Sequence, residues 1–258
     1  MRRGENEEYV YGINAIRALI SAHRESLHAL LIARDKRDPR LRTLLSSAAE
    51  AGIPVHARPT AVLSKLVGNH HHQGLVAVVA GFAYSDLETL LEHGRAVDNP
   101  LYILLDGVQD PGNLGAVIRS AFLFGAQGLI MPKDRAVGVT PAVRKAAAGG
   151  AERLPIARVS NLGQAMAFMS KNYGVWMLAL DQNAPDPIYA HDLRRPLGLV
   201  VGGEAKGMRP SIKKRCEMTA HIPRMIADHS MDSLNVSVAA GIALYEVRRQ
   251  GGSSKGAL

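Results

Sequence analysis

Short apolar runs alternate with helical patterns along almost the whole chain, and this alternation limits the possible folds more than any other feature. Residues 27–33, 75–80, 101–105 and 197–201 are apolar runs of the kind that form buried strands. Segments with helical period, such as residues 39–48, lie between such runs. Strands that alternate with helices predict a mainly parallel sheet, so we expect an α/β protein.

The chain is long enough for one large domain or two modest ones, and a polar, turn-rich stretch divides it. Apolar residues make up 47% of the 258 residues, which suffices for a packed core. We expect a small N-terminal α/β domain at residues 1–83 and a linker at residues 84–99. A C-terminal domain should follow at residues 100–250, with a disordered tail at residues 251–258.

The expected elements of the N-terminal domain form an αβαβαβ unit. They are helices at residues 12–23, 39–52 and 59–67, and strands at residues 27–33, 53–57 and 75–80. A short helix is expected at residues 86–93. The expected strands of the C-terminal domain lie at residues 101–105, 128–131, 175–180, 197–201 and 220–222, with a long last helix at residues 235–249.

The chain is strongly basic, with a formal net charge of +8 and a pI near 9.8. Such an excess favours a polyanionic partner such as RNA, DNA or an anionic membrane. No window reaches the roughly 20 apolar residues of a membrane span, and the first residues lack the apolar core of a signal peptide. Cys216 is the only cysteine, which excludes an internal disulfide. We therefore expect a cytoplasmic protein without a membrane partner.

A glycine-rich turn follows the strand at residues 101–105. The sequence of residues 106–119 is DGVQDPGNLGAVIR, and it enters a helix in which Arg119 lies beside the apolar stripe. Glycines let backbone amides approach a ligand, and a helix N-terminus attracts anions. The spacing is neither that of a dinucleotide-binding turn nor that of a Walker loop. Taken alone, an arginine in such a helix is more often part of a solvated face.

Two further segments combine a turn with small or polar residues. Residues 199–208, LVVGGEAKGM, end a strand in a glycine pair followed by Glu204, which is either a ligand-site residue or an acid at a helix N-terminus. Residues 233–246, SLNVSVAAGIALYE, begin a helix that Ser233 or Asn235 caps. Each segment alone is compatible with an ordinary structural role.

Taken in order, the three segments closely resemble the three motifs of the SpoU (TrmH-like) RNA 2′-O-ribose methyltransferases, and the resemblance spans residues 101–250. The N-terminal half agrees with it, since residues 11–15, YGINA, and residues 72–77, HQGLVA, resemble the substrate domain of the ribosomal-RNA branch. The implied fold is a C-terminal SPOUT-type domain with a parallel sheet and a deep trefoil knot, preceded by a ribosomal-protein-like RNA-binding domain.

The resemblance also implies a cofactor and an oligomeric state. Members of the family bind S-adenosylmethionine in the knot and work as homodimers. The threaded part is expected between residues 199 and 243. The implied cofactor contacts are backbone groups around Gly202, Gly203, Ile222 and Leu234, and no metal is required.

Five catalytic-site residues follow from matching the motifs: Asn113, Arg119, Glu204, Ser233 and Asn235. The family assigns activation of the ribose hydroxyl to Arg119. Because an arginine side chain has a pKa above ~12, we expect Arg119 to stabilise the developing alkoxide rather than to accept a proton. Glu204, Ser233 and Asn235 are expected to position Arg119 and the ribose.

The expected substrate is a guanosine in 23S ribosomal RNA. The N-terminal domain favours ribosomal RNA, whereas the polar loop at residues 223–232, longer than in the commonest ribosomal-RNA enzymes, leaves transfer RNA as the main alternative. A knotted RNA-binding protein without activity, a methyltransferase acting on a base nitrogen and an oxidoreductase are further alternatives. The missing dinucleotide-binding turn disfavours the oxidoreductase.

Other conspicuous residues are open to two interpretations. Arg144, Lys145 and Arg153 are either phosphate contacts or a solvated face. Residues 70–72, three adjacent histidines, favour an RNA contact or a simple loop over a metal site. Cys216 is expected to be a packed side chain rather than a nucleophile.

Overall fold

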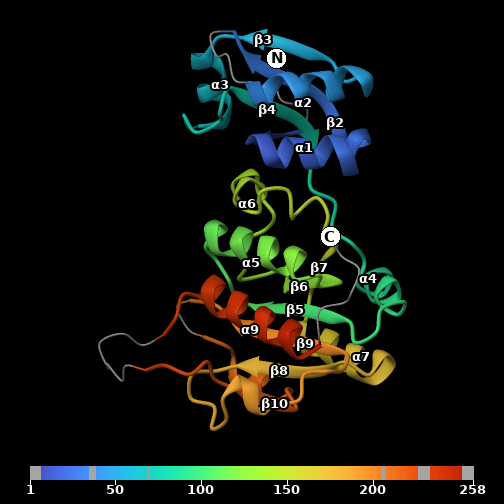
Figure 1. Cartoon of the computed structure of the whole chain (residues 1–258), viewed down its shortest axis with the longest axis vertical. Coiled ribbons are helices and arrows are strands. Elements are labelled where there is room, and N and C mark those ends of the chain that lie inside the picture. The colour runs from blue at the N-terminus through green and yellow to red at the C-terminus, as the bar shows by residue number, and fades with distance from the viewer. Residues whose placement is uncertain (1–6, 35–38, 69, 205–206, 226–232, 252–258) are drawn as a thin grey trace. The chain divides into compact units, whose positions relative to one another are not determined.

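The structure is a computed structural model that describes residues 7–34, 39–68, 70–204, 207–225 and 233–251. The chain forms two compact units (Figure 1). The first unit comprises Met1–Ala83 and Val139–Arg153, and the second comprises Tyr84–Gly138 and Leu154–Leu258. The first unit is therefore discontinuous in sequence. The limits expected for the functional domains, at residues 1–83 and 100–250, stay predictions.

A four-stranded sheet forms the centre of the first unit, in the order β1-β4-β2-β3. Its strands are β1 (Glu7–Tyr11), β2 (Leu27–Ala33), β3 (Val55–Arg58) and β4 (Leu75–Ala80). Strand β4 is antiparallel to both β1 and β2, whereas β2 and β3 are parallel. Strand β1 was not predicted, because this edge strand begins with two glutamates and lacks an apolar run.

Helices cover both faces of this sheet. They are α1 (Ile13–Ala22), α2 (Pro39–Glu50) and α3 (Thr60–Val67), with a short 3-10 turn at Arg24–Ser26. Leu30 of β2 packs in one core cluster with α1 and α2, while the next residue, Leu31, packs with Leu63 of α3. Successive residues of a strand point to opposite faces, so α1 and α2 cover one face and α3 covers the other.

The first unit also contains α6 (Pro141–Ala146), which comes from the second half of the sequence. This helix contacts β1 and α1. Just after it, Gly149 has a φ of +98° and lies so close to α1 that a Cβ there would be 2.9 Å from the Cβ of Ala18. The segment at residues 139–153 is thus tightly packed within the first unit.

A six-stranded sheet forms the centre of the second unit, in the order β10-β8-β9-β5-β6-β7. Every strand pair in it is parallel, which confirms the predicted parallel sheet. The strands are β5 (Leu101–Asp106), β6 (Gly128–Pro132), β7 (Ile156–Val159), β8 (Trp176–Leu180), β9 (Leu197–Gly202) and β10 (Met218–Ala220). The four-residue edge strand β7 was not predicted, and β10 ends at the residue where the predicted strand begins.

The main helices of the second unit cover both faces of this sheet. They are α4 (Leu87–Gly94), α5 (Pro111–Leu123), α7 (Leu162–Tyr173) and α9 (Val236–Gly251), with short helical turns at α8 (Pro210–Lys213) and Ile188–Ala190. Leu90 of α4 and Met166 of α7 pack in one cluster with Leu104 of β5. Helices α5 and α9 lie side by side and contact β6 and β9 (Figure 1). No helix in the described ranges is long and apolar enough to cross a membrane.

Candidate functional site

The site begins where two neighbouring parallel strands end. Strand β5 ends at Asp106 and β9 ends at Gly202, and these two residues are paired in the register of the sheet. The carboxyl ends of parallel strands lie at one edge, which is where α/β proteins bind ligands. The first two sequence motifs are therefore adjacent in space because their strands are neighbours.

Helix α5 carries the first motif away from this edge. Pro111 occupies its first turn, and the carboxylate of Asp110 accepts a hydrogen bond of 2.7 Å from the backbone N–H of Asn113. Proline in the first turn and aspartate at the N-cap are favourable local choices for starting a helix. The cap fixes the start of α5, and with it the position of the Asn113 side chain.

A chain of hydrogen bonds joins the three motifs. The side-chain Nδ2 of Asn235 donates to Oδ1 of Asn113 over 2.9 Å, and Nδ2 of Asn113 donates to Oε1 of Glu204 over 2.7 Å. The backbone N–H of Gln109 also donates to Oε2 of Glu204, at 3.5 Å. We call Asn235, Asn113 and Glu204 the three-motif network. Each amide donates to the next residue, and the Glu204 carboxylate ends the network as its acceptor.

Asn235 has a second function as the cap of α9. Its Oδ1 accepts hydrogen bonds from the backbone N–H groups of Ser237 and Val238, at 2.8 and 3.4 Å, and from the Ser237 hydroxyl at 2.7 Å. Of the two caps allowed by the sequence, Asn235 is therefore the one that forms. Because Oδ1 is used by the helix, only the Nδ2 group of Asn235 is available to donate to Asn113.

Two glycines allow the second motif to pack against the first. A Cβ on Gly203 would lie 2.2 Å from the carbonyl oxygen of Gly107, and a Cβ on Gly202 would lie 2.3 Å from the backbone nitrogen of Met208. Contacts this short leave no room for a side chain. The glycine pair therefore serves close contact between backbone segments.

Two of the predicted catalytic residues lie outside the three-motif network. Arg119 is exposed on α5, and Ser233 is exposed before α9, within the part of the chain that the structure describes. Arg119 and Asn113 lie on the same helix, six residues apart. Their chemical roles stay predictions.

The predicted cofactor contacts are distributed around the same edge of the sheet. Gly202 ends β9, whereas Ile222 follows β10 by two residues and is half-buried. Leu234 precedes α9 and is exposed. That these residues contact a cofactor stays a prediction.

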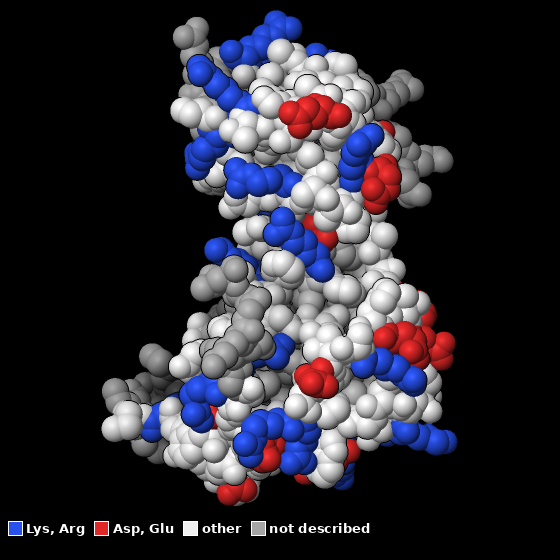
Figure 2. All heavy atoms as spheres, turned by 45° about the vertical axis from the view of Figure 1, so that its right-hand side comes forward, with Lys and Arg blue, Asp and Glu red and all other residues white. Residues whose placement is uncertain are grey.

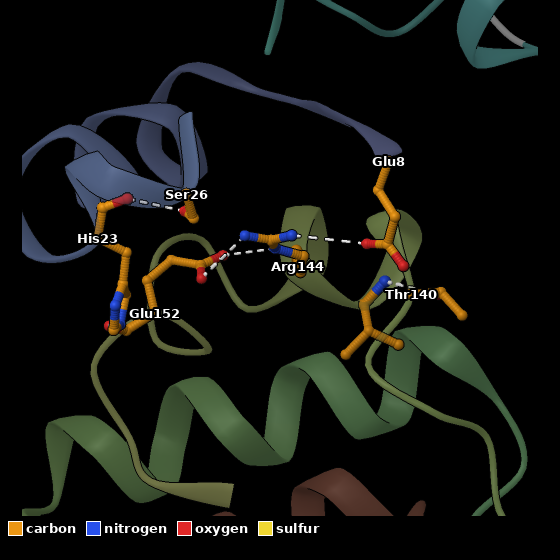
Figure 3. Close-up of polar contacts among 7 residues, drawn as sticks. Glu8, His23, Ser26, Thr140, Arg144 and Glu152 are labelled. Carbon is orange, nitrogen blue, oxygen red and sulfur yellow. Dashed lines mark hydrogen bonds and ion pairs between the residues drawn. The ribbon is translucent and has the colours of Figure 1, made fainter. Parts of the chain in front are cut away.

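Arg144 is neither a phosphate contact nor part of a solvated face, so both interpretations offered for it are wrong. Arg144 is 2% exposed, and its Nε and Nη2 donate to the carboxylate of Glu152 at 2.8 and 3.2 Å (Figure 3). A further nitrogen, Nη1, lies 3.5 Å from Oε2 of Glu8. The arginine is thus a buried structural residue. Lys145 lies over the ring of Tyr11 at 5.0 Å, and Arg153 is exposed.

His72, in the histidine run, forms a buried hydrogen-bonded pair with Ser64. His72 is fully buried; its Nδ1 accepts from the backbone N–H of Gly74 and its Nε2 lies 3.1 Å from the hydroxyl of Ser64. Both ring nitrogens are therefore engaged by the protein. Within the described ranges, no cluster of three or more His, Cys, Asp or Glu side chains is arranged to hold a metal ion.

Cys216 is partly buried and packs in the core that includes α7 and Ile212. Burial, together with the charge of Glu217, raises the pKa of its thiol to about 12. Only a thiolate is a good nucleophile, so this cysteine is inert at neutral pH.

Two residues of the site were not identified from the sequence. Asp110 was read as part of a glycine-rich turn, although an aspartate directly before proline is a signal for an N-cap. Arg209 lies against the buried carboxylate of Asp106. Since 103 positions separate these two residues, no local pattern could have paired them.

Two protein families match this chain, one over each half. The family described as SpoU rRNA Methylase matches residues 100–245, and the family described as RNA 2′-O ribose methyltransferase substrate binding matches residues 9–85.

Relatives and a solved structure cover almost the whole chain. A Coxiella burnetii protein named 23S rRNA (guanosine-2′-O-)-methyltransferase RlmB is 41% identical over 242 residues, covering 93% of this chain and 95% of that protein. A protein of the same name from Pseudomonas aeruginosa is 39% identical over 246 residues, covering 94% and 96%. The SpoU methyltransferase AviRb from Streptomyces viridochromogenes, in complex with the cofactor AdoMet, matches with a TM-score of 0.78 at 26% identity, covering 95% of this chain and 90% of that one.

Proposed function

Since this chain belongs to the SpoU rRNA methylase family, we propose that it transfers the methyl group of S-adenosylmethionine to the 2′-hydroxyl of a guanosine ribose in 23S ribosomal RNA. The observation that carries the proposal is the three-motif network, which brings Asn113, Glu204 and Asn235 into one site. The relatives that match over most of the chain support the choice of RNA.

The reaction needs help at the attacking oxygen. A ribose hydroxyl is a poor nucleophile until its proton leaves, and bound S-adenosylmethionine supplies an electrophilic methyl group on a sulfonium. The positive charge of Arg119 is suited to stabilising the developing charge on the 2′-oxygen. Glu204, held by Asn113, keeps a negative charge beside the first motif, where it orients the donors of the site.

We assign the cofactor to the edge formed by Gly202, Gly203, Ile222 and Leu234, and the deep trefoil knot to residues 199–243. The short backbone approaches at Gly202 and Gly203 support this assignment, because they bring the end of β9 against both Gly107 and Met208. Ser233 completes the proposed catalytic set.

The first unit is the proposed RNA-binding domain. Its match to the substrate-binding family and the net charge of +8 support this role. Arg17, Arg34, Arg42 and Lys65 are exposed there. On the face drawn in Figure 2, Lys and Arg side chains are spread widely, with smaller acidic groups between them. Because its substrate is ribosomal RNA, we place the protein in the cytoplasm.

A homodimer is the proposed assembly. Val238, Ile242 and Tyr245 of α9 are 49%, 38% and 57% exposed, and Leu123 of the neighbouring α5 is 69% exposed. The spacing of the three α9 residues places them on one face of the helix. An apolar helix face of this kind is typical of an interaction site, and a second copy of the chain would cover it.

Methyl transfer to defined RNAs tests the function. The purified protein is incubated with radiolabelled S-adenosylmethionine and either 23S ribosomal RNA or transfer RNA, and the product is digested with alkali. Ribose methylation blocks cleavage of the adjacent phosphodiester, so we expect label in alkali-resistant dinucleotides from 23S RNA. Label in mononucleotides would contradict ribose methylation, and label only in transfer RNA would contradict the substrate.

Substitution of Arg119 tests the site. Loss of an electrostatic stabiliser typically lowers kcat about 100–1,000-fold, so Arg119→Met should do so. Arg119→Lys should keep part of the activity because it keeps the charge. Lys171→Met, an exposed cation on α7, is the control and should leave the rate unchanged. An unchanged rate in Arg119→Met would remove Arg119 from the mechanism.

A further inference from the structure

Asp106 is a buried carboxylate at the end of β5, and it is 3% exposed. Its Oδ2 accepts from the backbone N–H of Arg209 at 2.9 Å, and its Oδ1 accepts from Nε of Arg209 at 2.8 Å. The Nη2 of Arg209 lies 2.6 Å from the same Oδ1. A carboxylate removed from water needs this kind of compensation, because burying an unpaired charge is strongly unfavourable.

The backbone of Asp106 binds the second motif at another position, Gly203. Its carbonyl oxygen accepts a hydrogen bond of 2.9 Å from the N–H of Gly203. The N–H of Gly207 in turn donates to the carbonyl oxygen of Gly203 at 3.0 Å. Asp106 therefore fixes the second motif at Gly203 through its main chain and at Arg209 through its side chain.

Glu204 lies between these two attachment points. Its carboxylate is the acceptor that ends the three-motif network, at 2.7 Å from Nδ2 of Asn113. A carboxylate on a segment attached at one end only would sample many positions, and holding it costs conformational entropy. Because Gly203 and Arg209 are both bonded to Asp106, Glu204 loses less conformational entropy when it bonds to Asn113.

The Arg209–Asp106 pair differs from an ordinary surface pair of the same chemistry. Arg194 and Asp192 also form two hydrogen bonds, at 2.9 and 3.3 Å, but they are two positions apart and both are well exposed. Exposed pairs contribute little to structure. Arg209 is also exposed, but its partner is buried and 103 positions away, so the pair joins two separate segments of the site.

We propose that Asp106 and Arg209 are a positioning pair for methyl transfer. They hold the backbone at Gly203 and at Arg209, so that Glu204, the residue next to Gly203, stays bonded to Asn113. Neither residue touches the reacting atoms in this scheme; both act through Glu204. The expected effect on methyl transfer rests on the proposed function, whereas the expected effect on the position of Glu204 does not.

Kinetics of single and combined variants test the proposal. Misplacing a site residue typically costs about 10–100-fold in rate, so we expect Arg209→Met to lower kcat by that factor and Arg209→Lys to lose less. Added to Glu204→Gln, Arg209→Met should lower kcat less than about 2-fold further, because its effect passes through Glu204. Arg194→Met is the matched control and should behave as wild type. The proposal would be overturned if Arg209→Met lowered kcat by the same factor in the wild type and in Glu204→Gln. It would also be overturned if Arg209→Met left the wild-type kcat unchanged.

A second measurement does not depend on activity. The Asn113 side-chain amide gives two proton signals in a nitrogen-15 NMR spectrum, and its bond to Glu204 determines their shifts. Arg209→Met should move these signals toward their positions in Glu204→Gln, with melting curves confirming that each variant is folded. Signals that stay at wild-type positions would overturn the positioning role. If the wild type transfers no methyl group to RNA, the proposed function fails while this comparison still decides the inference.

Discussion

The side-chain amide of Asn113 donates to the carboxylate of Glu204 over 2.7 Å, although 91 positions separate the two residues. This contact joins the turn after β5 to the turn after β9, and Asn235 extends it to the start of α9. The three motifs that are far apart in the sequence are therefore parts of one polar structure.

Removing the central amide should reduce methyl transfer without unfolding the protein. Asn113→Ala is expected to lower kcat about 10–100-fold, because Glu204 and Asn235 each lose their partner at a partly exposed site. Steady-state kinetics with 23S RNA and a melting curve measure the two effects. Asn172→Ala, which removes an exposed amide bonded to Phe168 on α7, is the control. A variant with wild-type kcat would show that the network is dispensable.

The exposed face of α9 should determine the oligomeric state. We expect Ile242→Glu to convert a dimer into a folded monomer, because a charge would be buried at the centre of an apolar contact. Sedimentation velocity gives the mass, and circular dichroism reports folding. Val97→Glu is a matched control, since Val97 and Ile242 are both 38% exposed. A wild-type chain that sediments as a monomer would refute the proposed assembly.

The buried ion pair in the first unit should be important for stability. Glu152→Gln leaves the guanidinium of Arg144 without its main partner, which typically costs about 3–5 kcal/mol in the free energy of unfolding. Urea denaturation measures the loss. The double variant Arg144→Met with Glu152→Leu should recover much of it, because a packed apolar pair can replace a buried ion pair. Glu25→Gln, at an exposed site in the same unit, should change the free energy of unfolding little. An equally large loss of stability in Glu25→Gln would contradict a special role for the buried pair.

A methyl group at Gly203 should disrupt the second motif. The nearest backbone atom would lie 2.2 Å from the new Cβ, so Gly203→Ala is expected to cost about 3 kcal/mol, the upper end of the range for overcrowded sites. Denaturation and methyl-transfer assays should both report the change. Gly251→Ala has no atom within 4 Å of the added carbon and serves as the control. Equal stability of the two variants would contradict the close packing.

Cys216 should resist alkylation in the folded protein. With its pKa raised to about 12, the thiol stays protonated at pH 8, and the rate with iodoacetamide should be roughly a thousandfold below that of a free cysteine. Between pH 8 and pH 11 the rate should rise about tenfold per unit, because the thiolate fraction does so. Mass spectrometry follows the adduct, since the chain has one cysteine. Unfolding in guanidinium should restore rapid reaction; rapid reaction of the native protein would contradict the raised pKa.

Strands with continuous apolar runs were predicted well, while short edge strands were not. Residues 27–33 and 75–80 became β2 and β4 with the predicted bounds, and the family resemblance is confirmed by the comparisons. Strands β1 and β7 were missed, because edge position relaxes the need for an apolar run. A strand that is buried on both faces is a continuous apolar run in the sequence, whereas a partly buried edge strand is not.

Long-range pairing is what the sequence did not reveal. The motifs predicted a shared site, but the specific bonds from Asn113 to Glu204 and Asn235 depend on strand order. Both interpretations of Arg144, as a phosphate contact and as part of a solvated face, were wrong because no sequence pattern indicates its two acidic partners. Its partner Glu152 is eight positions away, a spacing that does not place two side chains together on a helix, and its other neighbour, Glu8, lies on β1.

The packing of residues 139–153 within the first unit has a consequence for how the protein is made. Translation delivers the sheet strands of this unit by Ala80, yet Arg144, which faces Glu8, and Gly149, which lies against α1, leave the ribosome much later. Domains usually fold in the order of their synthesis. Here the first unit lacks its last packed segment until residues 84–138 of the second unit have been made, so its synthesis is complete only at Arg153.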